Sequence, residues 1–259
     1  MDSKNIVSEF VHPTIMSTPC FMVSVLAIYL VTVIYLGPRF MRRRQPFDLK
    51  PIIILHNVIQ VLSCIYTVNE ILQITGYQIL LFWKCSLVPE THELLERHFK
   101  LSYFLFWLKI SELIETVIFV LRKKQNQITK LHVFHHIATV TLIYLLINHN
   151  ENSFSALYPI FLNSNVHIVM YSYYLVAAVA DKKTIRALTP VKKSITVIQM
   201  VQFLFILMQA GIVSVKCGVP KLVFFYFVAV ICFMFYGFYD FYRSSYKKAQ
   251  RRKSSATAK

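Results

Sequence analysis

The sequence predicts an all-α protein that crosses a membrane several times, and its composition, hydropathy and block lengths support this fold class. Hydrophobic residues make up 56% of the 259 residues and charged residues only 15%, whereas a soluble domain carries about 25% charged residues. The mean hydropathy is +0.52. The apolar residues form long blocks, and a helix needs roughly 20 such residues to cross about 30 Å of hydrocarbon.

Seven apolar blocks are predicted to be helices, because a helix satisfies its backbone hydrogen bonds internally and lipid offers no other partner. In chain order they cover residues 20–37, 51–73, 101–121, 131–148, 157–180, 194–213 and 221–242. The chain has only five glycines, which disfavours a channel packed through glycine-rich interfaces. The sequence contains no internal repeat, paired CxxC metal motif or glycine-rich phosphate loop.

The positive charges predict the direction in which the helices cross. Most of the 28 lysines and arginines lie at 38–50, 122–130 and 181–193 and in the tail. Basic connections remain in the cytosol, so we expect a lumenal segment at 1–19, a seven-helix domain at 20–242 and a basic cytosolic tail at 243–259. The net charge of +16 therefore reflects topology, and nucleic-acid binding is not expected. A basic cytosolic rim can instead attract anionic headgroups or a polyanionic substrate.

Two of the five cysteines, Cys85 and Cys217, fall in connections on the predicted oxidising side of the membrane. Disulfides persist in oxidising compartments. The topology by itself leaves a Cys85–Cys217 bridge and two free thiols equally open.

Polar and ionisable side chains interrupt five of the predicted spans, and at membrane depth such groups face the bundle interior or a watery cavity. They are His56, Asn57 and Gln60; Lys109, Ser111, Glu112, Glu115 and Thr116; His132, His135 and His136; Asn163, Ser164, Asn165, His167, Tyr171, Tyr173 and Tyr174; and Thr196, Gln199, Gln202 and Gln209. At about 1.5 Å of rise per residue, all five helices place such groups in their cytosolic halves. This convergence predicts a shared site near the cytosolic face.

Two clusters within this set share a helix face. His132, His135 and His136 lie at i, i+3 and i+4, so their imidazoles project from one side of the helix. Lys109 and Glu112 lie at i and i+3, and pairing lowers the cost of burying each charge. We interpret this pair as facing a substrate, with a purely structural salt bridge as the alternative.

The HVFHH pattern of residues 132–136 has two chemical interpretations. Neutral imidazoles bind iron or zinc, and they also act as nucleophiles and general bases near pH 7. A di-iron site uses about six ligands, and too few histidines lie at the right depth, although Glu112 and Glu115 could supplement them. No metal site is therefore predicted. An iron-dependent desaturase or hydroxylase stays as an alternative, and so does a seven-span transporter or receptor for an anionic ligand.

Four ordered motifs carry a resemblance to a known family. The stretches KISELIET, HVFHH, NSNVHIVMYSYY and TVIQMVQ resemble the K-x-x-E-x-x-D-T, H-x-x-H-H, N-x-x-V-H-x-x-M-Y-x-Y-Y and T-x-x-Q-x-x-Q motifs of the ELO family of very-long-chain fatty acid elongases. The stretch LGPRFMRRRQPFDLKPIIILHNVIQV is also similar to the first cytosolic loop and second span of this family, particularly in insect members. The resemblance covers roughly residues 25 to 245, and Glu115 stands where the family usually has Asp.

The resemblance implies a 3-oxoacyl-CoA synthase of the endoplasmic reticulum membrane, which joins a long-chain acyl-CoA with malonyl-CoA and releases CO2 and CoA. It also implies seven helices, six of them in two inverted three-helix units around an acyl tunnel, and a Cys85–Cys217 disulfide. No cofactor is expected besides the two CoA substrates. Membrane lipid is the expected surrounding, and a second copy of the chain and other enzymes of the elongation cycle are candidate partners.

The resemblance also implies roles for the ionisable residues. His135 is expected to attack the thioester and form an acyl-imidazole, since imidazole is a good nucleophile and a good leaving group. His136 and His167 are expected to donate hydrogen bonds to developing oxyanions or to orient the nucleophile. Glu112 and Glu115 are expected to orient imidazoles or to pair with Lys109.

The remaining matching positions are expected to bind or position the substrates. Gln199 and Gln202 are expected to position the reactants by hydrogen bonds, as is Asn163. The residues expected to contact acyl-CoA are Lys109, Arg122, Lys124, Gln127, His132, Asn163, Tyr173, Lys192 and Thr196. For Arg122, Lys124 and Lys192, the general excess of basic residues on the cytosolic side is an equal explanation.

Overall fold

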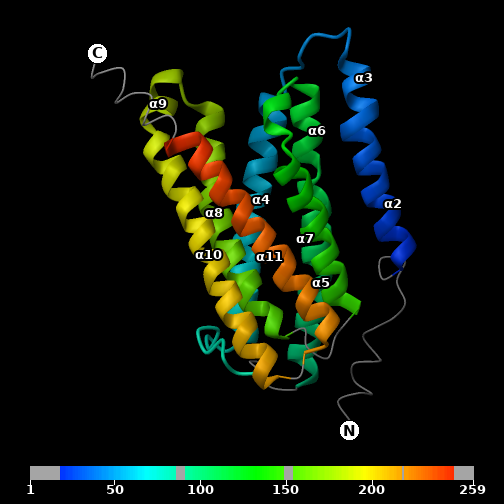
Figure 1. Ribbon diagram of the computed structural model, residues 1–259, viewed down its shortest axis with the longest axis vertical. Helices are drawn as coiled ribbons and strands as arrows, with labels where there is room; N and C mark the ends of the chain where they lie inside the picture. The colour runs from blue at the N-terminus through cyan, green and yellow to red at the C-terminus, as the bar shows by residue number, and fades with distance from the viewer. Residues whose placement is uncertain (1–17, 86–90, 149–153, 218, 248–259) are drawn as a thin grey trace.

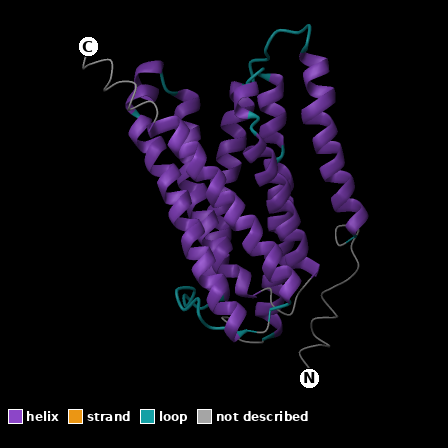
Figure 2. Cartoon of the chain, in the orientation of Figure 1, coloured by secondary structure: helices purple, strands orange, loops and turns teal. Residues whose placement is uncertain are grey.

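The computed structural model describes residues 18–85, 91–148, 154–217 and 219–247. Every regular element in these residues is a helix (Figure 2), which confirms the predicted all-α class. Residues 1–17 of the predicted lumenal segment and 248–259 of the predicted tail lie outside the described residues.

Each of the seven predicted blocks is helical, and five helices in the described part of the chain are long and apolar enough to cross a membrane. These five are Pro19–Met41, Lys50–Ile74, Lys130–Asn148, Thr189–Lys216 and Lys221–Tyr246. The other two predicted blocks, 101–121 and 157–180, carry the densest polar motifs, which make them less apolar. The structure thus supports a multi-pass membrane protein.

The first span, Pro19–Met41, is built from three consecutive segments. They are α2 (Pro19–Leu30), the π-helical η2 (Val31–Leu36) and α3 (Gly37–Met41). Pro19 suits the first turn because the N–H that it lacks would have no partner within the helix. The side chain of Thr18 accepts a hydrogen bond from the Phe21 N–H at 3.4 Å and so caps this end.

Six further helical segments pack into a closed ring. They are α4 (Lys50–Ile74), α5 with α6 (His92–Glu112 and Ile114–Leu121), α7 (Lys130–Asn148), α8 (Leu157–Val179), α10 (Thr189–Lys216) and α11 (Lys221–Tyr242). Within the ring α4 packs on α5 and α8, α10 on α8 and α11, and α7 on α5 and α11. The first span lies outside this ring, with α2 against α7 and both η2 and α3 against α6 (Figure 1).

The third predicted block differs from its expected bounds of 101–121. Its helix begins at His92 and is interrupted at Leu113, between α5 and α6. The Leu113 N–H bonds the Ile110 carbonyl at 3.1 Å, and the Thr116 N–H bonds the Leu113 carbonyl at 3.2 Å. These bonds reach three residues back rather than four, so the chain tightens locally into a 3₁₀-like turn.

The connections divide between the two ends of the bundle. The basic connections lie at the end that carries α3, α6 and the short helix α9 (Lys182–Ala187) in Figure 1. At the opposite end, Cys85 and Cys217 form a disulfide with their Cα atoms 5.2 Å apart. This bridge ties the connection before α5 to the C-terminal end of α10.

Candidate active site

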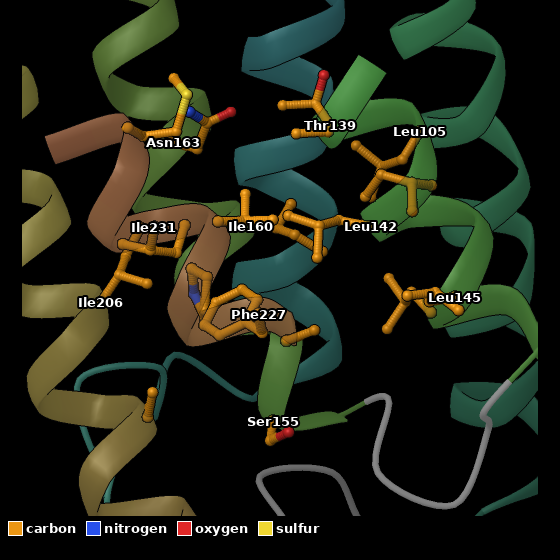
Figure 3. Close-up of a pocket in the computed structure, with 18 of the residues that line it drawn as sticks. Leu105, Thr139, Leu142, Leu145, Ser155, Ile160, Asn163, Ile206, Phe227 and Ile231 are labelled. Carbon is orange, nitrogen blue, oxygen red and sulfur yellow. The ribbon is translucent and has the colours of Figure 1, made fainter. Parts of the chain in front are cut away.

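The ring of helices encloses a cavity of about 220 Å³, with residues from α4, α5, α7, α8, α10 and α11 in its lining. Along α10 the lining extends from Gln202 to Val213, which is roughly 16 Å at the rise of an α-helix. Figure 3 shows apolar walls, with Leu142 on one side of the space and Ile206 and Ile231 on the other. A long apolar cavity of this kind fits a hydrocarbon chain.

The end of the cavity nearest the basic connections is polar. The polar side chains that line it there are Lys109, His135, Asn163, Ser164, His167 and Gln202. Among the three imidazoles of the HVFHH segment, only His135 belongs to this lining. His132 and His136 instead lie toward α6. The structure therefore singles out His135 as the histidine of this segment that a bound chain would meet.

Other imidazoles surround His135. Its ring centroid lies 5.4 Å from that of His136 and 6.4 Å from that of His167. Both of these neighbours are buried. In the described residues, neither ring nitrogen of His136 has a hydrogen-bond partner, and neither does Nδ1 of His167. Buried polar atoms are normally satisfied, so these nitrogens are candidates to bind a substrate.

Glu112 forms the predicted buried ion pair with Lys109. The Lys109 Nζ lies 2.7 Å from Glu112 Oε1, and both side chains are almost fully buried. The same carboxylate oxygen lies 3.7 Å from Nδ1 of His167. Since Lys109 also lines the cavity, the pair both compensates a buried charge and places an ammonium group beside the cavity.

Glu115 contacts a different pair of imidazoles. Its Oε1 lies 3.3 Å from Nε2 of His56, and its Oε2 lies 3.9 Å from Nε2 of His136. Glu112 and Glu115 therefore belong to separate groups, although they lie only three residues apart. His56, one of the polar residues identified in the second predicted span, thereby joins the second group.

His132 is held by Thr116, which belongs to the polar set identified from the sequence, and Thr116 in turn contacts Tyr29, which sequence reasoning did not assign to the site. Its Nε2 lies 2.9 Å from Oγ1 of Thr116, which lies 2.9 Å from the hydroxyl of Tyr29. Tyr29 comes from the first span, where no motif marks it. The only available signal was a hydroxyl in an apolar block, and Thr32 and Tyr35 in the same block give the same signal.

The structure places the remaining predicted residues elsewhere. Gln199 donates to the Met170 sulfur at 3.5 Å, and the Thr196 hydroxyl donates to the Lys192 carbonyl in its own helix at 3.2 Å. The ring of Tyr173 lies 5.9 Å from that of Tyr174. Outside the cavity lining, at the basic end, lie Arg122, Lys124, Gln127 and Lys192, of which all but Arg122 are exposed. The roles expected for these residues stay predictions.

One group of side chains in the described ranges could hold a metal ion. Ligand atoms of Glu115, His132 and His136 lie within 4.8 Å of one another, and carboxylate with imidazole donors suits zinc or iron. Nε2 of His132 is already hydrogen-bonded to Thr116. A metal bound through that nitrogen would therefore have to displace the Thr116 hydroxyl.

Known proteins with similar sequences match this chain along nearly its whole length. The model of the family described as ELO: GNS1/SUR4 family matches residues 14–254. The chain is 32% identical to very long chain fatty acid elongase F of Drosophila melanogaster, over 93% of this chain and 96% of that protein. It is also 32% identical to a very long chain fatty acid elongase of Aedes aegypti, over 93% of this chain and 67% of that protein. It is 31% identical to very long chain fatty acid elongase 1 of Mus musculus, over 92% of this chain and 85% of that protein.

Proposed function

Because this chain belongs to the ELO (GNS1/SUR4) family, we propose that it is the condensing enzyme of fatty acid elongation, which joins a long-chain acyl-CoA with malonyl-CoA. The observation that carries the proposal is the position of His135 at the polar end of a long apolar cavity. A fatty chain can occupy the cavity while its thioester carbonyl reaches the imidazole.

In the first half-reaction, a ring nitrogen of His135 attacks the thioester carbonyl carbon. The new N–C bond forms, the C–S bond breaks, and the departing thiolate takes up a proton to leave as CoA. Neutral imidazole suits this step because it is a good nucleophile and, once acylated, a good leaving group. Negative charge develops on the carbonyl oxygen, and one well-placed donor in a dry site lowers such a barrier by about 3 kcal/mol. The buried rings of His136 and His167 are the candidate donors.

In the second half-reaction, malonyl-CoA loses CO2 and the electron pair of the broken C–C bond forms an enolate. The enolate carbon attacks the acyl carbonyl and the C–N bond to His135 breaks. The departing ring nitrogen takes up a proton from solvent, which restores the imidazole, and 3-oxoacyl-CoA leaves. Lys109 lies at the polar end of the cavity, where its ammonium can contact an anionic group of either substrate. Its pairing with Glu112 keeps this charge compensated between turnovers.

We further infer that all seven predicted blocks cross the membrane of the endoplasmic reticulum. The six segments of the ring then form the acyl tunnel as two units, α4 to α7 and α8 to α11, with the first span outside. The closed ring of helix contacts supports this arrangement. The basic end would face the cytosol and the polyanionic CoA, and the disulfide lies at the opposite, oxidising end.

Mass spectrometry of the purified protein after incubation with a long-chain acyl-CoA, without malonyl-CoA, tests the proposal. We expect the peptide that contains His135 to gain the mass of the acyl group and to lose it when malonyl-CoA is added, as 3-oxoacyl-CoA appears. His135→Ala should form no adduct. His92→Ala changes an exposed histidine at the start of α5 and should form the adduct normally. An acyl adduct of the same yield in His135→Ala would overturn the assignment.

A metal-dependent desaturase or hydroxylase is the second candidate, because the ligand atoms of Glu115, His132 and His136 lie close together. Metal analysis of the active protein separates the two functions. Stoichiometric iron with oxygen-dependent activity would favour the second candidate. Condensing activity that survives treatment with a strong chelator would favour the elongase.

A further inference from the structure

We propose that Tyr29, in the first span, is a positioning residue that sets the hydrogen-bonding state of His132 through Thr116. The inference rests on the proposed condensing function, because the turnover of that reaction is its readout. In the described residues, the first span supplies no side chain to the cavity lining. Any effect of Tyr29 on the site must therefore pass through the side chains that it contacts.

Tyr29, Thr116 and His132 form a continuous hydrogen-bonded chain. The Tyr29 hydroxyl lies 2.9 Å from Thr116 Oγ1, which lies 2.9 Å from His132 Nε2, and both distances are normal for hydrogen bonds. Tyr29 is 5% exposed and Thr116 is fully buried, so water does not compete for these hydroxyls. The His132 ring then packs edge-on against the ring of His136 at 4.4 Å. His136 is the neighbour of the proposed nucleophile, His135.

The direction of the chain follows from its protons. A threonine hydroxyl has one proton to donate, so Thr116 donates to one neighbour and accepts from the other. Across the described ranges, the Tyr29 hydroxyl has no hydrogen-bond partner except Thr116, and its proton is satisfied only if Tyr29 donates there. Thr116 then donates to Nε2 of His132, which must carry no proton. His132 is thereby held neutral, with its proton on Nδ1.

This tautomer determines whether the free ring nitrogen of His132 donates or accepts a hydrogen bond. His132 lies in the first turn of α7, beside the basic connections, and is partly exposed. With the proton on Nδ1, the ring offers a donor that orients a carbonyl group of the bound CoA substrate for reaction, an effect that appears in kcat. The opposite tautomer would offer an acceptor at the same place and repel that carbonyl. The hydrogen bond of a neighbouring group commonly sets a histidine tautomer in this way.

The backbone of the first span is shaped to hold Tyr29 against α6. The π-helical η2 begins two residues after Tyr29. Such π segments are rare in proteins overall, and many of those that occur lie at functional sites. Thr116 and Val120 are four residues apart, on one face of α6. Gly37 approaches Val120 so closely that an added Cβ would lie 2.6 Å from its Cγ1. The wider π turn changes the rotation between Tyr29 and Gly37, which allows both residues to reach this face.

A double-mutant cycle tests the inference on the purified full-length chain. Tyr29→Phe removes the hydroxyl and keeps the ring. We expect kcat to fall about fivefold to tenfold, the factor that one ordinary hydrogen bond provides, while the KM for acyl-CoA changes less than about twofold. Thr116→Val should lower kcat at least as much. In the Thr116→Val background, Tyr29→Phe should have no further effect, because the chain is already broken.

Control variants separate the chain of hydrogen bonds from simple packing. Tyr35→Phe alters a tyrosine on the same span that is 60% exposed and should leave kcat unchanged. Thr116→Ser keeps the hydroxyl and should recover most of the turnover that Thr116→Val loses. Should Thr116→Val fail to fold, Tyr29→Phe in a His132→Gln background provides a second cycle with the same expected lack of additivity.

Two outcomes would overturn the inference. In one, the effects of Tyr29→Phe and the second substitution multiply; in the other, Tyr29→Phe lowers thermal stability and leaves kcat unchanged. An acyl adduct on wild-type His135 under either outcome would mean that the condensing function stands and only the role of Tyr29 fails. Absence of an adduct on His135 in the wild type would defeat the proposed function itself.

Discussion

The two ends of the cavity differ in what their side chains can do. At the polar end, imidazoles, carboxylates and an ammonium from several helices contact one another over 2.7 to 3.9 Å. At the other end the lining is mostly apolar, and the Gln209 side chain is occupied in donating to the Ser155 carbonyl at 2.9 Å. We infer that the polar end determines the rate of reaction. The apolar end determines which chain lengths the cavity accepts and contributes to the stability of the protein.

The largest expected effect is the loss of the nucleophile at the polar end. His135→Ala should lower turnover about a thousandfold or more, the scale seen when a catalytic nucleophile is removed. Thermal stability should fall little, because the ring lines a cavity rather than packing in the core. Initial rates of malonyl-CoA incorporation and a melting curve measure the two quantities. Near-normal turnover in this variant would contradict the inference that the polar end determines the rate.

The buried ion pair should show the next largest effect. Glu112→Gln leaves Lys109 buried without its counter-ion, and removing one partner of such a pair costs about 3 to 5 kcal/mol. Both melting temperature and turnover should fall, and Lys109→Met combined with Glu112→Gln should recover part of the stability but not the turnover. The matched control is Glu96→Gln on the same helix, since its partner Lys100 lies 2.6 Å away in a far more exposed pair. That variant should lose almost no stability, because exposed ion pairs contribute little. A loss equal to that of Glu112→Gln would show that burial of the pair does not matter here.

The disulfide tests the opposite end of the bundle. Replacing Cys85 and Cys217 together by Ser should lower the free energy of unfolding by about 2 to 4 kcal/mol. At a temperature where the variant stays folded, kcat should change less than about twofold, because the bridge lies far from His135. Cys232→Ser removes an exposed free thiol and serves as the control. A large loss of kcat with unchanged stability would contradict the division of roles.

The smallest effect on total activity should come from the apolar end. Val213 is buried on α10 and lines the cavity, so Val213→Phe should shorten the space for the chain. A pocket discriminates one methylene by about 1 to 3 kcal/mol, and we therefore expect products to shift to shorter chains while short substrates react almost normally. Val215→Phe on the same helix is the control, since Val215 is 86% exposed. An unchanged product profile, measured by gas chromatography, would mean that this end does not limit chain length.

The helical blocks and many residues of the candidate site could be predicted from the sequence. Hydropathy and helical period are local properties, so all seven helical blocks could be found from their apolar content. The i, i+3 spacing of Lys109 and Glu112 likewise predicted the ion pair that the structure contains. The predicted start at residue 101 was wrong, because the polar and charged residues from His92 to Lys100 are helical although they are not apolar. The interruption at Leu113 was missed, because no proline or glycine marks it.

The sequence by itself therefore determined the helical class of the protein, its family motifs and the positions of its polar groups along the helices. Only the tertiary structure decided which imidazole of HVFHH lines the cavity, and that Glu112 and Glu115 serve different histidines. It alone brought Tyr29 to Thr116 across 87 residues of sequence. The physical reason is that spacing determines which side chains share a face, whereas the rotation of each helix depends on the neighbours against which it packs.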